Sequence, residues 1–341
     1  MPTTADRYPW HAAAWRTLVD RHAQGRLPHA LLIDGPAGTG RHAFAHRIAA
    51  AILCATPDAT TGEACGGCRS CQLFSAGSHA DFHHLRLLLK GESLGGKKLT
   101  QDATRIRIDQ VRQLGATLSL SAQHGGWKVT LVEPADLMMP EAANALLKTL
   151  EEPTPQTLLM LVATRRNRLL PTIRSRCQRL SLAMPARDQA VAWLTGQGVA
   201  DSEALLALAD GSPLLALDLA NDGAVTARRE AFDALGGVLT GHNDPVAVAA
   251  KWSAADPARL FGWLGSWLVD MIRLKSGAGS PVLDNRDLAD RMQVLIETID
   301  LVYLFARLDE LQRARRLVET QVNAQLLCEE LLLGWQPTRP T

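Results

Sequence analysis

One segment near the N-terminus restricts the fold more than any other, because it joins a strand-like run, a glycine-rich turn and a helix-like stretch. The apolar residues 30–33 lead into Asp34-Gly35-Pro36, which predicts a buried strand followed by a turn. Apolar residues then recur at helical spacing from Phe44 to Ile52. A strand, a tight turn and a helix in this order are the building unit of sheets with parallel strands.

The segments that follow repeat the alternation. Residues 83–89, 129–132 and 157–163 read as further strands. Between the last two, residues 141–152 carry one apolar face and stop at Pro153, which predicts a helix. The first half is therefore an α/β domain whose parallel sheet is covered on both faces. After Leu182 the pattern becomes helical to the end of the chain.

Composition bounds the architecture and excludes some functions. With 341 residues and 47% hydrophobic content, the chain suits two or three globular domains. The 36 basic and 35 acidic residues nearly cancel, which argues against a surface covered throughout by nucleic acid. We find no apolar signal-peptide region, and the run 260–269 is too short to cross a bilayer. We therefore expect a cytoplasmic protein without membrane contact, whose cysteines bind metal or stay free.

The glycine-rich turn has the frame of a phosphate-binding loop without its chemistry. Gly35 and Gly40 hold the glycine positions of the pattern G-x-x-x-x-G-K-[ST], and Gly38 lies between them. Arg41 replaces the lysine that reaches the phosphates, and His42 replaces the hydroxyl that holds Mg²⁺. An imidazole is a poor ligand for Mg²⁺, which prefers oxygen. We expect a degenerate loop that does not bind ATP productively; the alternative is an ordinary glycine turn that caps a helix.

The second half of an ATPase site should be acidic and lie at the end of a strand. Residues 128–132 lead into Glu133-Pro134, where a working site places one acid for Mg²⁺ and often a second for the attacking water. Proline cannot polarise water. Glu133 either touches a metal ion or is a surface acid at the end of the strand.

Four cysteines gather within eighteen residues. Cys54, Cys65, Cys68 and Cys71 have the spacing C-x10-C-x2-C-x2-C. Four thiolates make a closed tetrahedral site, which suits structural Zn²⁺. An iron–sulfur cluster and redox thiols are the alternatives, but the spacing matches neither ferredoxin pattern. We assign the nearby His79, His83 and His84 to strand or loop.

A short arginine motif follows the last predicted strand. Ser175-Arg176-Cys177 is expected in a loop that leaves the edge of the sheet. An arginine supplied to a neighbouring subunit can stabilise charge on the γ-phosphate of that neighbour's ATP. The alternative is a surface arginine or an intramolecular ion pair.

Together these motifs resemble the delta prime subunits of bacterial DNA polymerase III clamp loaders. Over residues 8–222 the resemblance rests on the loop, the cysteines, the motif Ser175-Arg176-Cys177 and three longer segments. The segments are Pro28-His29-Ala30-Leu31-Leu32, Ile106-Arg107-Ile108-Asp109-Gln110-Val111-Arg112 and the helical run Ala142-Ala143-Asn144-Ala145-Leu146-Leu147-Lys148-Thr149-Leu150-Glu151-Glu152-Pro153. Beyond residue 222 it rests on helical character and length.

The resemblance implies an AAA+ P-loop-type parallel sheet domain, a small helical lid domain and an all-helical C-terminal collar domain. We place these at 1–182, with a zinc module at about 54–71, at 183–222 and at 223–341. The implied function is that of a non-hydrolysing subunit of a DNA-directed DNA polymerase holoenzyme, with Arg176 as an arginine finger acting in trans. The implied partners are gamma/tau motor subunits, the delta subunit, the sliding clamp and primer-template DNA.

Two other functions remain open from the sequence. One is an ATP-hydrolysing motor subunit of the gamma/tau kind, which tight binding of ATP and Mg²⁺ would support. The other is a stand-alone zinc-containing DNA-binding protein, which strong, salt-sensitive binding to duplex DNA would support.

Overall fold

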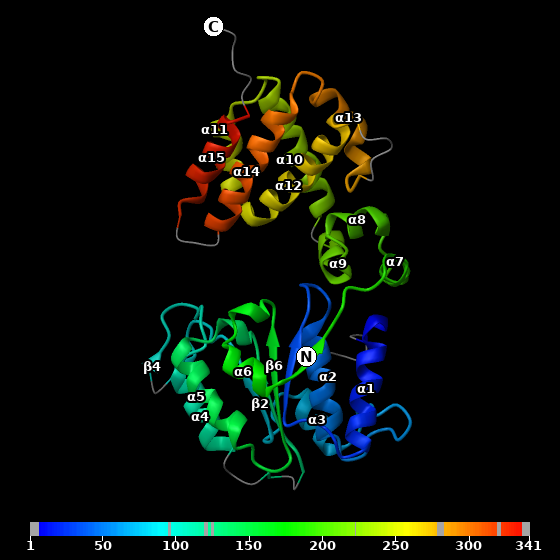
Figure 1. Cartoon of the computed structure of the whole chain (residues 1–341), viewed down its shortest axis with the longest axis vertical. Helices are drawn as coiled ribbons and strands as arrows, with labels where there is room; N and C mark the ends of the chain where they lie inside the picture. Colours follow the sequence, from blue (N-terminus) through cyan, green and yellow to red (C-terminus); the bar gives the residue numbers. More distant parts are fainter. Residues whose placement is uncertain are drawn as a thin grey trace. The chain divides into compact units, whose positions relative to one another are not determined.

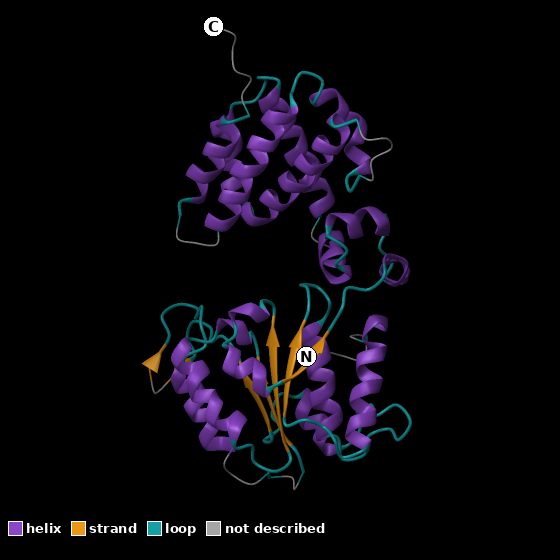
Figure 2. Ribbon diagram, viewed as in Figure 1, coloured by secondary structure: helices purple, strands orange, loops and turns teal. Residues whose placement is uncertain are grey.

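The computed structural model describes residues 7–94, 97–118, 122–123, 126–221, 223–277, 283–318 and 322–335. The chain divides into two compact units, Met1–Gln189 and Ala190–Thr341, and each is described by itself. All strands of the described residues lie in the first unit, whereas the described part of the second contains helices (Figures 1 and 2). Among the described residues, no helix combines the length and apolar character needed to cross a membrane.

The first unit is built on a five-stranded sheet with the order β2-β5-β6-β1-β7. Every neighbouring pair in this sheet is parallel. The strands are β1 (Ala30–Asp34), β2 (Phe82–Leu85), β5 (Lys128–Val132), β6 (Thr157–Ala163) and β7 (Gln178–Ser181). A separate antiparallel pair joins β3 (Ser93–Leu94) to β4 (Lys97–Lys98). The predicted α/β class with a parallel sheet is confirmed.

Helices cover both faces of the sheet because side chains alternate along each strand. On β1, Leu31 and Ile33 pack with the helices α1, α2 and α3. Ala30 and Leu32 on the same strand pack with α4, α5 and α6. Figure 1 shows these two helical layers on opposite sides of the strands. The helices are α1 (Ala12–Ala23), α2 (Arg41–Leu53), α3 (Arg69–Ser75), α4 (Ile108–Leu118), α5 (Pro140–Glu151) and α6 (Pro171–Arg176).

The second unit is helical and has one continuous core. Its buried side chains form a single cluster that runs from Ala190 to Trp335 and includes the fully buried Trp267. The helix α7 (Arg187–Gly196) contains the boundary between the two units. The helices that follow are α8 (Ser202–Leu208), α9 (Pro213–Asn221), α10 (Ala224–Leu239), α11 (Pro245–Ala254), α12 (Pro257–Lys275), α13 (Ala289–Leu295), α14 (Leu301–Leu317) and α15 (Ala324–Leu333). The division into a lid and a collar at residue 222 stays a prediction.

Local sequence explains where the long helices of this unit begin. Asp244 and Asp256 accept hydrogen bonds from backbone N–H groups in the first turns of α11 and α12, and a proline follows each aspartate. Asp300 caps α14 in the same manner. Such caps satisfy N–H groups that the helix itself cannot bond, and the fixed φ of proline suits the first helical position.

Candidate functional site

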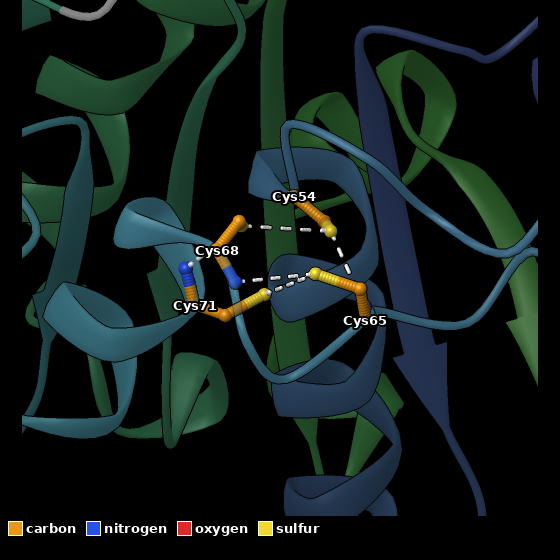
Figure 3. A group of neighbouring side chains, drawn as sticks. All are labelled: Cys54, Cys65, Cys68 and Cys71. Carbon is orange, nitrogen blue, oxygen red and sulfur yellow. Dashed lines mark hydrogen bonds between the residues drawn. The ribbon is translucent and has the colours of Figure 1, made fainter.

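The four cysteines come together at the far end of the helix that starts at the glycine loop. Cys54 is the residue directly after α2, whereas Cys68 caps α3 and Cys71 lies within it. Their four sulfur atoms lie within 4.8 Å of one another (Figure 3). The Sγ atoms of Cys54 and Cys68 are 3.9 Å apart, and those of Cys65 and Cys71 are 4.0 Å apart. Four thiolates bound to one zinc ion would be about 3.8 Å apart, given a Zn–S distance of about 2.3 Å.

Backbone and hydroxyl groups donate hydrogen bonds to these sulfur atoms. The N–H of Cys65 points to the Cys54 sulfur at 3.3 Å, and the N–H of Cys68 points to the Cys65 sulfur at 3.3 Å. The Thr56 hydroxyl and backbone N–H groups lower the pKa of Cys65 to about 6, whereas burial raises the pKa of Cys71. Donors aimed at sulfur stabilise thiolates. The cluster can therefore hold a metal ion through four sulfur ligands.

The glycine-rich loop, residues 35–40, is bonded to Arg41, the first residue of α2. Arg41 Nη1 donates to the carbonyl oxygens of Gly35, at 2.5 Å, and of Ala163, at 3.0 Å. Its Nη2 donates to Thr164 Oγ1 at 2.9 Å. The guanidinium thus joins the start of the loop to the end of β6, and burial lowers the pKa of Arg41. These donors already have partners, so phosphate oxygens would have to displace them.

His42 is bonded across the same site. Its Nδ1 lies 2.5 Å from Oε2 of Glu133, the residue directly after β5. In a working ATPase the corresponding two positions meet through Mg²⁺. Here an imidazole and a carboxylate meet directly, and their contact joins the first turn of α2 to the end of β5.

Aromatic residues before α1 cover the loop, and sequence reasoning missed them. The rings of Tyr8 and Trp10 stack with centroids 5.0 Å apart. Trp10 Nε1 donates to the Thr39 carbonyl oxygen at 2.9 Å, and His11 Nε2 lies 2.7 Å from the same oxygen. Gly40 has a φ of +81°, and a Cβ atom there would clash with the Tyr8 ring. The spacing of these residues gives no signal, because the contacts join segments about thirty residues apart.

Arg176 lies apart from the loop, at the end of a short helix. The prediction of a loop at this position is wrong, because Pro171 starts α6 and Arg176 is its last residue. Arg176 Nη2 forms an ion pair with Glu151 Oε1 at 2.7 Å, and Nη1 donates to the Thr172 carbonyl oxygen at 3.0 Å. The Arg176 side chain is 37% exposed, so a group outside the chain can reach it.

Comparison with protein families matches residues 10–186 to "DNA polymerase III, delta subunit" and residues 223–337 to "DNA polymerase III, delta subunit, C terminal". The delta' subunit of Pseudomonas aeruginosa DNA polymerase III is 36% identical over 97% of this chain and 98% of its own length. The Escherichia coli delta' subunit is 34% identical over 96% of this chain and 94% of its own length.

A solved DNA polymerase III gamma subunit-related protein from Thermotoga maritima aligns over 94% of this chain and 98% of its own, at 15% identity and a TM-score of 0.40. That likeness is too low to add to the fold described above. The family match and the two relatives agree along nearly the whole sequence. The chain belongs to the family of DNA polymerase III delta' subunits.

Proposed function

We propose that this protein serves in a clamp loader as a delta prime subunit that does not hydrolyse ATP. The observation that carries the proposal is the occupied phosphate loop, where Arg41 bonds to Gly35, Ala163 and Thr164 and where His42 bonds to Glu133. The groups that would hold phosphates and Mg²⁺ are replaced by side chains that bond to the protein itself. Productive ATP binding would have to break these contacts with no lysine or hydroxyl to compensate.

Calorimetric titration of the purified chain with ATP and Mg²⁺ tests whether the loop binds nucleotide. We expect no binding up to millimolar nucleotide. A matched variant, Arg41→Lys combined with His42→Thr, restores the two side chains of a phosphate loop and shows whether the backbone frame still accepts nucleotide. Micromolar binding by the unmodified chain would instead favour a motor subunit of the gamma/tau kind.

We further propose that Arg176 acts as an arginine finger for a neighbouring motor subunit. Its ion pair with Glu151 holds the guanidinium at the surface. A phosphate can accept hydrogen bonds from two nitrogen atoms of a guanidinium at once. ATP in the neighbour would replace Glu151 as the partner and tighten the contact between the subunits, and hydrolysis would release it. The sliding clamp would then close on primed DNA.

Reconstitution with gamma/tau motor subunits, the delta subunit and the clamp tests the finger. Arg176→Ala should leave assembly intact and lower DNA-stimulated ATPase activity and clamp loading. Arg112, a 69% exposed arginine on α4, supplies the control Arg112→Ala. Unchanged loading by Arg176→Ala would remove the finger assignment and leave the rest of the proposal standing.

We also propose that the cysteine cluster is a structural Zn²⁺ site. The spacing of the sulfur atoms fits a tetrahedral ion, and four sulfur ligands leave no open position for water. The ion would tie the end of α2 to α3 and take no part in chemistry. Elemental analysis should find one zinc ion per chain at this cluster, and Cys65→Ser should lower that content.

A further inference from the structure

Three histidines and a glutamate gather beside the phosphate loop. His42 and His46 lie one turn apart on α2, His84 lies on β2, and Glu133 follows β5. The ring centroids of His42 and His46 are 4.3 Å apart, those of His46 and His84 are 5.5 Å apart, and those of His42 and His84 are 6.1 Å apart. Glu133 Oε2 lies 2.5 Å from His42 Nδ1 and 4.0 Å from His84 Nε2.

Several nitrogen atoms of this cluster are buried without a hydrogen-bond partner among the described residues. Within the part of the chain that the structure describes, three ring nitrogens of the cluster have no hydrogen-bond partner: Nδ1 and Nε2 of His46, and Nε2 of His84. His46 is only 4% exposed. A buried polar atom left unpaired costs about 1–3 kcal/mol, and most such atoms in native proteins contact protein, water or an ion. These nitrogen atoms could be satisfied by a group that accepts an electron pair from them, such as a metal ion.

The spacing of the rings is near that of a metal site, although the ligand atoms converge less closely than the sulfur atoms of the cysteine cluster do. Two histidines four residues apart on one helix face are a recurrent pair of metal ligands. Three imidazoles on one tetrahedral ion would have ring centroids about 5 Å apart, given a metal–nitrogen distance of about 2.1 Å. The observed separations of 4.3, 5.5 and 6.1 Å lie around that value. Imidazole nitrogens with one carboxylate favour Zn²⁺, Co²⁺ or Ni²⁺ over Mg²⁺.

We propose that His42, His46, His84 and Glu133 form a second metal site, selective for divalent transition metal ions, at the degenerate ATPase centre. The ion binds the nitrogen atoms of His46 and His84 and the Glu133 carboxylate. His42 gives up its hydrogen bond to Glu133 and rotates onto the ion, which its 55% exposed side chain permits. The metal thus replaces the hydrogen that His42 and Glu133 share. This proposal does not depend on the arginine finger or on the cysteine site.

The test uses the full chain supplied with one equivalent of Zn²⁺, with the content checked by elemental analysis. The four-thiolate cluster, which is the tighter zinc site, is then filled and the histidine cluster is left empty. Ni²⁺ is titrated calorimetrically, and Co²⁺ is followed by visible absorption. We expect one further equivalent of either ion, with weak cobalt bands typical of nitrogen and oxygen ligands. A strong sulfur-to-cobalt charge-transfer band would place the ion at the cysteines and overturn the assignment.

Variants separate the site from adventitious surface binding. His84→Asn and the exposed His42→Asn should each weaken Ni²⁺ binding by about 100-fold or more, since even indirect ligand partners contribute 10–100-fold. His83→Ala changes the neighbouring residue on β2, whose side chain alternates to the opposite face of the sheet, and should bind as the unmodified chain does. Melting temperatures without metal confirm that each variant is folded. Equal binding by all variants, or no binding by the unmodified chain, would overturn the proposal.

Discussion

Removing the Arg41 side chain should destabilise the first unit and should not create a nucleotide site. The guanidinium makes three hydrogen bonds, to Gly35, Ala163 and Thr164, and they join the loop to β6. A hydrogen bond from a charged group contributes about 1.5–3 kcal/mol. Arg41 is only partly buried, so water can replace some of these bonds in Arg41→Ala. We expect the free energy of unfolding to fall by about 3 kcal/mol.

For a unit of this size, such a loss lowers the melting temperature by about 6–12 °C. Circular dichroism measures the melting temperature, and hydrogen exchange locates the effect. Backbone amides of residues 35–53 should exchange faster, while those of the helical second unit serve as an internal reference. Arg16→Ala, which removes an exposed arginine on α1, should change the melting temperature by less than about 2 °C. A melting temperature for Arg41→Ala equal to that of Arg16→Ala would refute the structural role assigned to Arg41.

Three further predictions concern the metal, a buried arginine and pH. Cys71→Ser should lose the metal of the cysteine cluster and, with it, stability of the first unit, as elemental analysis and thermal melting will show. Arg228 is 1% exposed and bonds to Asn285 and Asp287, so Arg228→Met should lower the free energy of unfolding in urea by about 3–5 kcal/mol. Burial lowers the pKa of His11 to about 4 in the folded chain, so as the pH falls the unfolded chain binds a proton at His11 before the folded chain does. The free energy of unfolding should therefore fall between about pH 6.5 and 4. Urea midpoints that stay constant across that range would contradict this prediction.

The strands β1, β5 and β6 could be predicted from the sequence because they are buried along their whole length and read as apolar runs. The strand β7 was not predicted, because the residues of Gln178–Ser181 are mostly polar and exposed. Residues 157–163 were predicted as a strand and form β6 with the same bounds. The strand predicted at 83–89 is shorter, because β2 ends at Leu85. There it pairs with Val132, the last residue of β5, so the sheet offers no further partner for its backbone. The end of a strand thus depends on its neighbour, which local sequence does not show.

The chemistry of the candidate site was only partly predictable. The spacing of the cysteines suffices to predict their cluster, since their ligand atoms come from one short segment. The contact of His42 with Glu133 joins residues 91 positions apart, and no local pattern indicates it. The sequence does contain one usable signal for the histidine cluster, namely the four-residue spacing of His42 and His46. That spacing becomes informative only when β2 brings His84 beside the helix.

A single helix connects the features from which we infer the function. The first turn of α2 carries Arg41 and His42, which bond the loop to β6 and to Glu133, and the residue after its last turn is Cys54. In many enzymes a loop or a domain closes around the bound substrate and opens again to release product. Here both ends of α2 are held by contacts that require no nucleotide, and a metal ion at the cysteines would hold the distal end more firmly. Such a helix is consistent with the subunit proposed above, which would offer Arg176 to a neighbour whose own site changes with ATP.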